Sequence, residues 1–228
     1  MTAITAEPTA TTEPPTESQS TSPIVDREFA KPASRASFER AADALRAKGY
    51  DVHVAPDRET AKRMILEMIP EGAEVSQGTS KTLEELGVTE AVETSGRYEA
   101  LRLKLRAMDR KTQGREIRKL GAAPDFWLNS VQALTEDGVL VNVSNTGSQI
   151  GPIAAGGGRL ILAIGSQKIV PDLETALRRV EEYNFPLEDA RLMAGYGMHT
   201  GISKVLITHR DVRQGRVSIV LIREAVGE

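Results

Sequence analysis

One apolar segment constrains the fold more than any other. Residues 159–165 read Arg-Leu-Ile-Leu-Ala-Ile-Gly and carry no polar side chain after the first. A strand with apolar side chains on both faces has to be covered on both sides, and such strands occur in parallel sheets that lie between layers of helices. The chain is therefore expected to be an α/β protein with an open, mostly parallel twisted sheet flanked by helices.

The segments before this strand support the same fold class. Apolar residues recur at helical spacing in residues 36–48 and 58–69, and residues 50–54 and 73–76 have the short patterns typical of strands. Helices and strands thus alternate along the chain, as they do in α/β proteins.

Three further regions complete the expected elements. Residues 80–121 are expected to be mostly helical, in about three pieces, with a short strand at 90–94. Residues 125–134 are expected to form a strand, and Asp-Gly at 137–138 predicts a tight hairpin turn into residues 139–143. The later expected elements are a short helix at 149–155, a helix at 172–183, and strands at 203–208 and 216–222.

The first 33 residues differ from the rest. Thr, Pro, Ser and Glu dominate them and no apolar periodicity is present, so residues 1–33 are predicted to be a disordered tail and residues 34–228 one domain. Met1 is followed by neither basic residues nor an apolar run, so no signal peptide is expected. No stretch approaches the about 20 apolar residues of a membrane span. The sequence therefore predicts a cytoplasmic protein without membrane insertion.

Charge argues against nucleic acid as a partner. Residues 1–33 carry five acids and two bases, a balance of −3, and the whole chain is also −3, so the remaining residues are close to neutral. A neutral domain lacks the broad positive field that attracts nucleic acid or acidic lipid. Residues 102–119 hold eight Lys and Arg, which we interpret as a solvated helical face, with steering of an anionic ligand as the alternative.

The composition also limits metal and redox chemistry. The chain has no Cys, which excludes disulfides, zinc fingers and cysteine-ligated iron–sulfur clusters within it. The three His residues show no metal-ligand spacing. No metal site is expected, and no cofactor is evident.

A glycine-containing turn offers a first candidate binding site. Residues 75–87 run from a strand through a turn into a helix, an arrangement whose free N–H groups can bind an anion. The turn residues proposed as ligands are Gly78, Thr79, Ser80 and Thr82. A strand-to-helix turn also needs Gly and an N-capping hydroxyl for stability alone, so a purely structural role is the alternative.

A second polar segment follows the predicted hairpin strand. It presents hydrogen-bonding groups without bulk, as a ligand-contact loop does, although ordinary surface loops look similar. The residues proposed from it are Asn142, Ser144, Thr146, Gly147, Ser148 and Gln149. Lys168 follows the buried strand 159–165 and would place a cation at the carboxyl edge of the sheet, where open α/β sheets bind ligands; a solvent-exposed lysine is the alternative.

Three ordered segments resemble the lactate-utilization (LUD) domain family. They are QGTSKTLEELG (77–87), SVQALTEDGVLVNVSNTGSQ (130–149) and IGSQKIVPDLETALRRV (164–180). With RVSIVLIRE (216–224) the likeness covers about residues 36–226. The resemblance implies the open α/β fold of ribose-5-phosphate isomerases, glucosamine-phosphate deaminases and CoA transferases, and a role in lactate or organic-acid utilization, since the family is typified by a subunit of a bacterial L-lactate oxidation system.

The resemblance also implies which residues meet. The phosphate turn of the isomerases is similar to residues 78–82, and their glycine-rich loop is similar to residues 142–148. The lysine of their D-x-S-K motif is similar to Lys168. A small anion, a sugar phosphate or a CoA-like pyrophosphate, is thus expected between Ser80 and Lys168.

The catalytic machinery of the isomerases is not fully matched. Where those enzymes carry acids, this chain has Asn129 and Gln132, which cannot take up a proton but remain candidate ligand-binding residues. Glu136 and Asp137 are the nearest carboxylates and weak candidates for a general base, although a hairpin turn also favours Asp-Gly. Whether the chain is an enzyme stays open. The alternative function is a non-catalytic subunit of an iron–sulfur-containing lactate-oxidizing complex, in which partner subunits carry the clusters.

Overall fold

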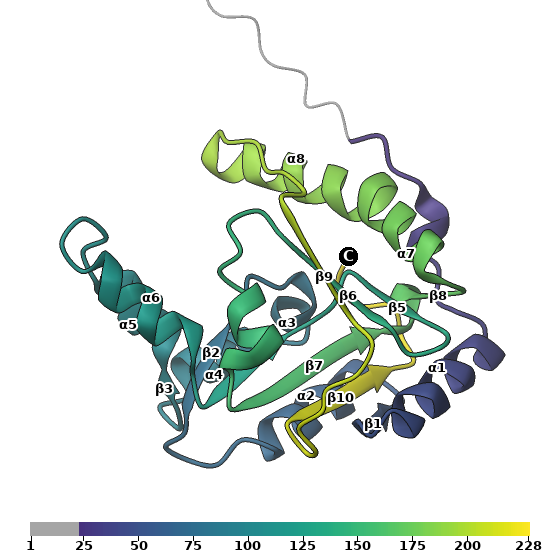
Figure 1. The fold of residues 1–228 in the computed structure, drawn as a ribbon, viewed down its shortest axis with the longest axis horizontal. Helices are drawn as coiled ribbons and strands as arrows, with labels where there is room; N and C mark the ends of the chain where they lie inside the picture. Colours follow the sequence, from purple (N-terminus) through teal and green to yellow (C-terminus); the bar gives the residue numbers. More distant parts are fainter. Residues whose placement is uncertain (1–22) are drawn as a thin grey trace, which may run out of the picture.

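A six-stranded parallel sheet forms the centre of the molecule. The computed structural model describes residues 23–228, and all neighbouring strands of this sheet run parallel (Figure 1). This confirms the predicted α/β class and mostly parallel sheet. In spatial order the strands are β1 (Asp51–Ala55), β10 (Val217–Ile222), β7 (Arg159–Gly165), β4 (Phe126–Asn129), β2 (Glu74–Gln77) and β3 (Glu99–Ala100).

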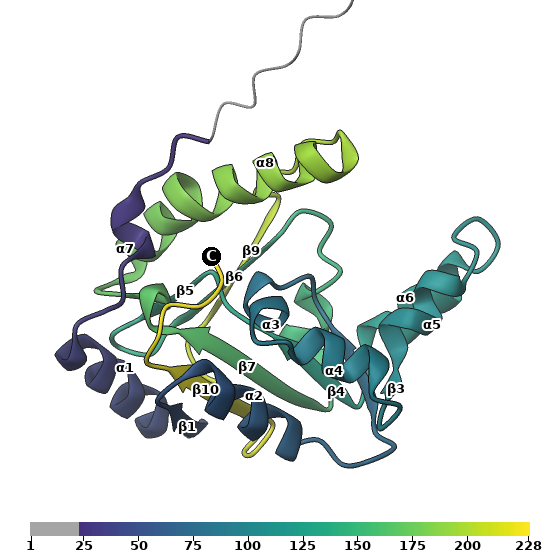
Figure 2. The ribbon, with the colours of Figure 1, turned by 180° about the vertical axis from the view of Figure 1, so that it is seen from behind.

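Apolar side chains cover both faces of the sheet. On one face, helix α1 (Arg35–Ala47) packs against Leu160, Leu162 and Ile164 of β7. On the other face, α2 (Arg58–Glu67), α3 (Lys81–Glu85) and α4 (Val88–Thr94) pack against side chains that include Ile161 and Ala163 (Figure 2). The apolar segment 159–165 is thus buried on both sides, as expected.

A second, four-stranded sheet packs beside the first. Its order is β8 (Ile169–Val170), β5 (Ala133–Thr135), β6 (Leu140–Ser144) and β9 (Lys204–Thr208). Strands β5 and β6 form the expected hairpin, and Gly138 in its turn has φ +79°. The single strand expected at 125–134 is instead two strands, β4 and β5, in different sheets, because residues 130–132 break the ladder and carry the chain from one sheet to the other.

The region 80–121 contains four helices rather than about three. The strand expected at 90–94 is wrong: these residues belong to α4, which buries Val88 and Val92 one turn apart, and the short strand lies later, at β3. Helices α5 (Leu101–Ala107) and α6 (Gly114–Ala122) form a hairpin, called here the basic arm, that projects from the body (Figures 1 and 2).

The later helices differ from those expected in type or length. A π-helix, η2 (Pro152–Gly156), replaces much of the short helix expected at 149–155. The helix expected at 172–183 begins as α7 (Leu173–Arg179), passes through a π-helical turn, η4 (Val180–Asn184), and continues as α8 (Phe185–Tyr196). The widened turn precedes Pro186, which lacks the N–H that a regular helical hydrogen bond requires. None of the helices described between residues 23 and 228 has the length and apolarity to cross a membrane.

The end of the predicted tail belongs to the folded domain. Residues Arg27–Ala30 form a 3-10 helix, η1, and Phe29 packs against the apolar cluster under α7. The Ala33 N–H donates to Ser166 O at 3.3 Å. The disorder expected for residues 1–22 concerns residues outside those described, whereas residues 27–33 are held against the domain.

Candidate functional site: a cleft at the carboxyl edge of the sheet

A cleft of about 1030 Å³ opens where β2, β4 and β7 end. Its walls come from segments far apart in the sequence: the turn after β2, the loop after β6, the basic arm, helix α8 and the loop that follows α8. Of the thirteen residues proposed as ligand-binding, all but Asn142 line this cleft. Asn142 lies beneath it, buried, and its side-chain N–H donates to Ser130 O at 2.9 Å.

The turn after β2 supplies unpaired donors. Ser80 caps α3 by accepting a hydrogen bond from the Leu83 N–H at 3.4 Å, so the structural role considered for this turn is present. The N–H groups of residues 79–82, however, donate to no acceptor in the described part of the chain. Gly78 leaves room for Gln149 here, because a Cβ atom would lie 2.8 Å from the side-chain oxygen of Gln149 and would force that side chain to shift. Residues 79–82 all line the cleft, so their N–H groups are candidate donors of hydrogen bonds to an anion.

Side-chain amides hold the loops of the cleft together. Asn129 donates to the side-chain oxygen of Gln149 at 3.1 Å, and Gln149 in turn donates to Val143 O at 2.7 Å. Gln132 accepts from the Val143 N–H at 2.8 Å. These amides thus fix the loop after β6 against the end of β4, which positions the remaining polar groups of that loop.

Lys168 lies buried at the base of the cleft, which rules out the solvent-exposed alternative. Its Nζ donates to the Thr82 hydroxyl at 3.0 Å, the Ser130 hydroxyl at 3.2 Å and Val131 O at 3.1 Å. Burial, together with the nearby Arg179 guanidinium, lowers the pKa of Lys168 to about 7. The lysine links the turn after β2 to the segment after β4 and is close to its midpoint of protonation at neutral pH.

Arg179 is a second buried cation next to Lys168. Its guanidinium donates to Gln167 O at 3.3 Å, to the side-chain oxygen of Asn184 at 2.7 Å and to Gln132 O. Burial lowers its pKa to about 10. Neither Arg179 nor Lys168 pairs with a carboxylate among residues 23–228. Lys168 thus lines the base of the cleft, Arg179 lies buried near it without lining the cleft, and the hydrogen-bond partners of both are neutral.

The final residue, Glu228, also lines the site, which the sequence patterns did not indicate. Gln167 donates to Val226 O at 2.8 Å and to Gly227 O at 2.9 Å, and accepts from the Val226 N–H at 3.2 Å. Glu228 then reaches the cleft, where burial raises the pKa of its carboxyl group. These residues follow the last strand and carry no motif, so only the folded arrangement brings them to the site.

A histidine–aspartate pair on the rim of the cleft was also not predicted, because no motif in the sequence links the two residues. His199 Nδ1 lies 2.9 Å from an Asp189 carboxylate oxygen, and the other oxygen accepts from the Thr200 N–H at 2.7 Å. Those two contacts lower the pKa of Asp189, the Thr200 bond most. His199 is largely exposed and lines the mouth of the cleft.

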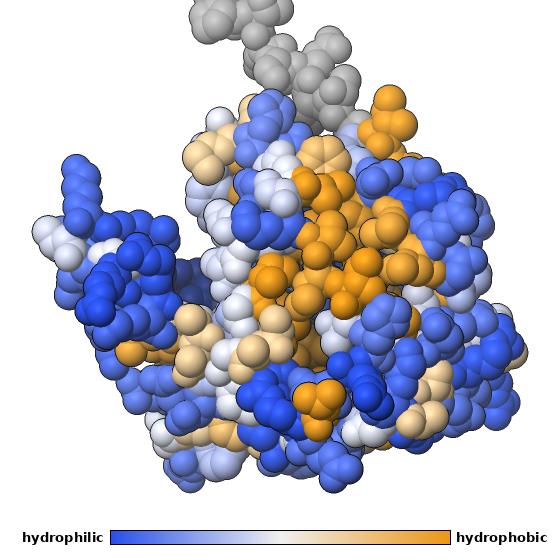
Figure 3. Space-filling model, viewed as in Figure 1, coloured by the Kyte–Doolittle hydropathy of each residue, from blue (hydrophilic) through white to orange (hydrophobic). Residues whose placement is uncertain are grey.

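The basic arm forms one wall. Arg102 and Arg106 each lie 3.7 Å from Glu93, while Arg110 and Arg118 also line the cleft. The arm is strongly hydrophilic on its surface (Figure 3). Part of the basic segment therefore faces the proposed ligand site as well as solvent.

The two weak candidates for a general base do not lie in the cleft. Glu136 accepts two hydrogen bonds from the Arg40 guanidinium of α1, at 2.6 and 2.9 Å, and Asp137 accepts from the Thr135 hydroxyl. Both carboxylates serve the hairpin turn and its contact with α1.

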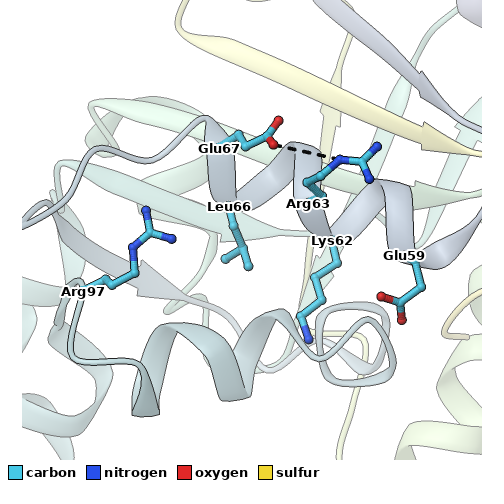
Figure 4. Close-up of a pocket in the computed structure, with 6 residues that line it drawn as sticks. All are labelled: Glu59, Lys62, Arg63, Leu66, Glu67 and Arg97. Carbon is cyan, nitrogen blue, oxygen red and sulfur yellow. Dashed lines mark ion pairs between the residues drawn. The ribbon is translucent and has the colours of Figure 1, made fainter.

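A smaller groove of about 380 Å³ lies elsewhere, along α2 (Figure 4). It is lined by three bases, two acids and one leucine: Glu59, Lys62, Arg63, Leu66, Glu67 and Arg97. Arg63 and Glu67 lie 3.9 Å apart within it. Mixed charges on one open helix face are typical of solvated surface. Among the described residues, no group of three or more His, Asp or Glu could hold a metal ion.

Comparisons with known proteins bear on the family. No curated protein matches the chain. A crystal structure of a DUF162 family protein from Deinococcus radiodurans matches with 12% sequence identity and a TM-score of 0.48, over 84% of this chain and 99% of that one. The model of the LUD domain matches residues 38–205, well over half of the sequence. The chain therefore belongs to the LUD-domain family.

Proposed function

We propose that the chain binds a small anionic metabolite, a sugar phosphate or a CoA-like pyrophosphate, in the cleft at the carboxyl edge of its sheet. The observation that carries this proposal is Lys168, which lines the cleft, is buried and donates hydrogen bonds only to neutral groups, with the buried Arg179 guanidinium near it. Burying a charge without a counter-charge is costly, and an anion in the cleft would supply one.

Three other features support an anion of metabolite size. The unpaired N–H groups of residues 79–82 are donors without acceptors, the loop after β6 adds hydroxyl groups, and the basic arm places further cations on the outer wall. A volume of about 1030 Å³ is at the upper end of the roughly 300–1,000 Å³ typical of small-molecule sites. The cleft is thus large enough for a ligand that extends from Lys168 toward the arm.

Family membership gives the biological setting. LUD-domain proteins are associated with lactate utilization, and that association extends to this chain. We propose that the bound anion is a metabolite of this part of organic-acid metabolism.

Thermal melting with a panel of anions tests the proposal. Ribose 5-phosphate, CoA and inorganic phosphate are each added to the wild-type chain and to Lys168→Met and Lys62→Met variants. Lys62 is the matched control, since it lies in the α2 groove (Figure 4) and not in the cleft. A ligand at one hundred times its Kd stabilises the folded state by about 2.7 kcal/mol, which raises Tm by several degrees. The proposal requires that at least one anion raises Tm of the wild type and Lys62→Met but raises that of Lys168→Met much less.

A second function, a subunit of an iron–sulfur-containing lactate-oxidizing complex, is favoured by a different observation. Apolar side chains lie exposed along the end of α8, the following loop and the edge strand β9, and apolar surface gathers over the second sheet (Figure 3). The largest of them are Met193, Tyr196, Met198, Ile202, Val205 and Ile207. Exposed apolar surface of this kind often marks a protein interface. Iron and acid-labile sulfide in the complex purified from the native host would support this role, and a chain that purifies alone would exclude it.

A further inference from the structure

Strand β9 is an open edge of the second sheet. Its neighbour in the sheet is β6, and no other element described between residues 23 and 228 packs extensively along it. Val205 and Ile207 are 43% and 37% exposed, in the apolar surface over this sheet (Figure 3), whereas Leu206 between them packs against the apolar core. The strand thus presents free backbone groups and apolar side chains on the same edge.

β9 differs from the other sheet edges that the structure describes. Strands β3 and β8 contain only two residues each, and β1 carries Asp51 and His53. Short length and polar or charged side chains are means by which proteins keep a sheet edge from pairing with another chain. β9 has five residues, and after Lys204 at its start it carries neither a charged residue nor a proline. It therefore lacks the protection that the other edges have.

The hydrogen-bond pattern identifies the free backbone groups of β9. In β6, Val141 O accepts a hydrogen bond at 2.9 Å from the residue that precedes β5, so Val141 directs its backbone groups toward β5. The next residue, Asn142, directs its groups the other way, toward its partner Leu206 in β9. Because these directions alternate along a strand, Val205 and Ile207 direct their N–H and C=O groups away from β6, where no described residue hydrogen-bonds to them.

This edge is complementary to a second copy of itself. When two β9 strands run antiparallel with Leu206 facing Leu206, Val205 of each copy lies opposite Ile207 of the other. The backbone groups of both residues point outward, so each such pair exchanges both of its N–H···O hydrogen bonds. Lys204 then faces Thr208, and no like charges lie directly opposite each other along the strand.

The neighbouring registers fit less well. With Ile207 facing Ile207, Lys204 lies opposite Arg210, and like charges directly opposite each other are destabilising. With Val205 facing Val205, only that one outward-facing pair lies within the strand. The arrangement about Leu206 therefore uses the free groups of the strand most fully.

We propose that a second copy of the chain occupies this edge, so that two β9 strands pair antiparallel about a twofold axis at Leu206. The two four-stranded sheets then form one continuous sheet, and the exposed side chains of Val205 and Ile207 cover those of the other copy. A twofold axis, which is the commonest symmetry of protein dimers, applies the same surface patch on both copies.

Disulfide cross-linking tests the register, because the chain contains no Cys of its own. Val205→Cys and Ile207→Cys variants are oxidised separately and as a mixture. Directly opposite residues have Cα atoms about 5.5 Å apart, within reach of a disulfide, whereas residues offset by two positions lie too far apart. The mixture should therefore cross-link roughly tenfold faster than either variant alone.

The cross-linking control is Val212→Cys, which lies 80% exposed in the loop after β9. Faster cross-linking of Val205→Cys or Ile207→Cys alone than of the mixture would overturn the proposed register. Cross-linking of the mixture no faster than that of Val212→Cys would overturn the dimer.

Sedimentation velocity with Ile207→Pro tests the dimer itself. Proline removes an N–H that β6 does not use, and edge strands tolerate proline where the N–H faces away from the sheet, so the domain should fold while the dimer is lost. The wild type and Val212→Lys should approach twice the mass of one chain as their concentration rises, and Ile207→Pro should not. Circular dichroism checks the fold, and Ile207→Lys replaces the proline variant if that variant does not fold.

A wild type that is still monomeric at about 100 µM would exclude the dimer. If the wild type is monomeric by itself and Ile207→Pro instead releases a different protein that copurifies from the native host, the edge belongs to that partner. That result would overturn the proposal and favour the subunit role described above.

Discussion

The stability of the folded chain should depend on pH through Lys168, and the dependence should disappear in Lys168→Met. Methionine keeps most of the volume of lysine but cannot be charged. The pKa of Lys168 falls from its usual 10.5 to about 7 on folding, mainly because the side chain is buried. One pKa unit corresponds to about 1.4 kcal/mol, so carrying the proton into the folded state costs about 5 kcal/mol at pH 6.

The sign of the effect follows from proton counts. Below pH 7 both the folded and the unfolded chain bind this proton, and the cost is fully present. Between pH 7 and about pH 10 the unfolded chain still binds it while the folded chain does not, so the free energy of unfolding rises with pH by up to about 1.4 kcal/mol per pH unit. The Lys168→Met variant lacks this rise.

Urea denaturation at pH 6, 7, 8 and 9 measures the difference between wild type and variant. The variant loses the hydrogen bonds to Thr82, Ser130 and Val131, which shifts its stability by an amount independent of pH. Other titrating groups, including Tyr50 with its raised pKa, are present in both proteins and cancel in the difference. Relative to the variant, the free energy of unfolding of the wild type should therefore rise by about 2 to 3 kcal/mol between pH 7 and pH 9. A difference that stays constant over this range would refute the assignment of a depressed pKa to Lys168, and Lys62→Met serves as the control that should follow the wild type.

Three further variants test other parts of the structure. Gly78→Ala would place a methyl group 2.8 Å from a neighbouring side-chain oxygen, so we expect a loss of about 1–3 kcal/mol in urea denaturation and weaker anion binding in calorimetry. Glu136→Gln removes the charge that pairs with Arg40. Because that guanidinium is half exposed, the loss in free energy of unfolding should stay below about 1 kcal/mol, and anion binding should not change. A large loss of anion binding would mean that Glu136 contributes to the ligand site after all. Gln167→Ala removes three hydrogen bonds to residues 226–227, so hydrogen exchange at residues 224–228 should become faster while β7 stays protected; unchanged exchange would mean that other contacts hold this segment.

Local patterns predicted most of the elements but not where the chain changes direction. Apolar residues recur at helical spacing in residues 36–48 and form a continuous run in residues 159–165. These patterns predict which side chains are buried, and both segments form the expected elements. The run at 125–134 reads as one strand because its apolar side chains continue through residues 130–132, where the backbone leaves one sheet for the other. Residues 88–94 can alternate as a strand or repeat as a helix, and only their packing over the sheet selects the helix.

The candidate site was predictable where topology alone brings residues together. The ends of parallel strands share one edge of the sheet, so the turn after β2, the segment after β4 and Lys168 after β7 had to approach one another once the strand order placed β4 between them. Asn142 was misplaced because it lies further from the end of β6, where its buried side chain donates to Ser130 O, whereas Val143 and Ser144 at the end of the strand line the cleft. His199 and Glu228 depend on where α8 and the final residues pack, which no local pattern records.

Lys168 also explains why the loops of the cleft can be so polar and still be ordered. Each hydrogen of its ammonium group is used by a neighbouring loop, so the cation cross-links the turn after β2 to the segment after β4 at the floor of the cleft. An anion that binds above it would favour the protonated form and so strengthen those same hydrogen bonds. Ligand binding, proton uptake and ordering of the cleft are therefore expected to be coupled through this one side chain, and near neutral pH, where the lysine is partly protonated, the coupling should be strong.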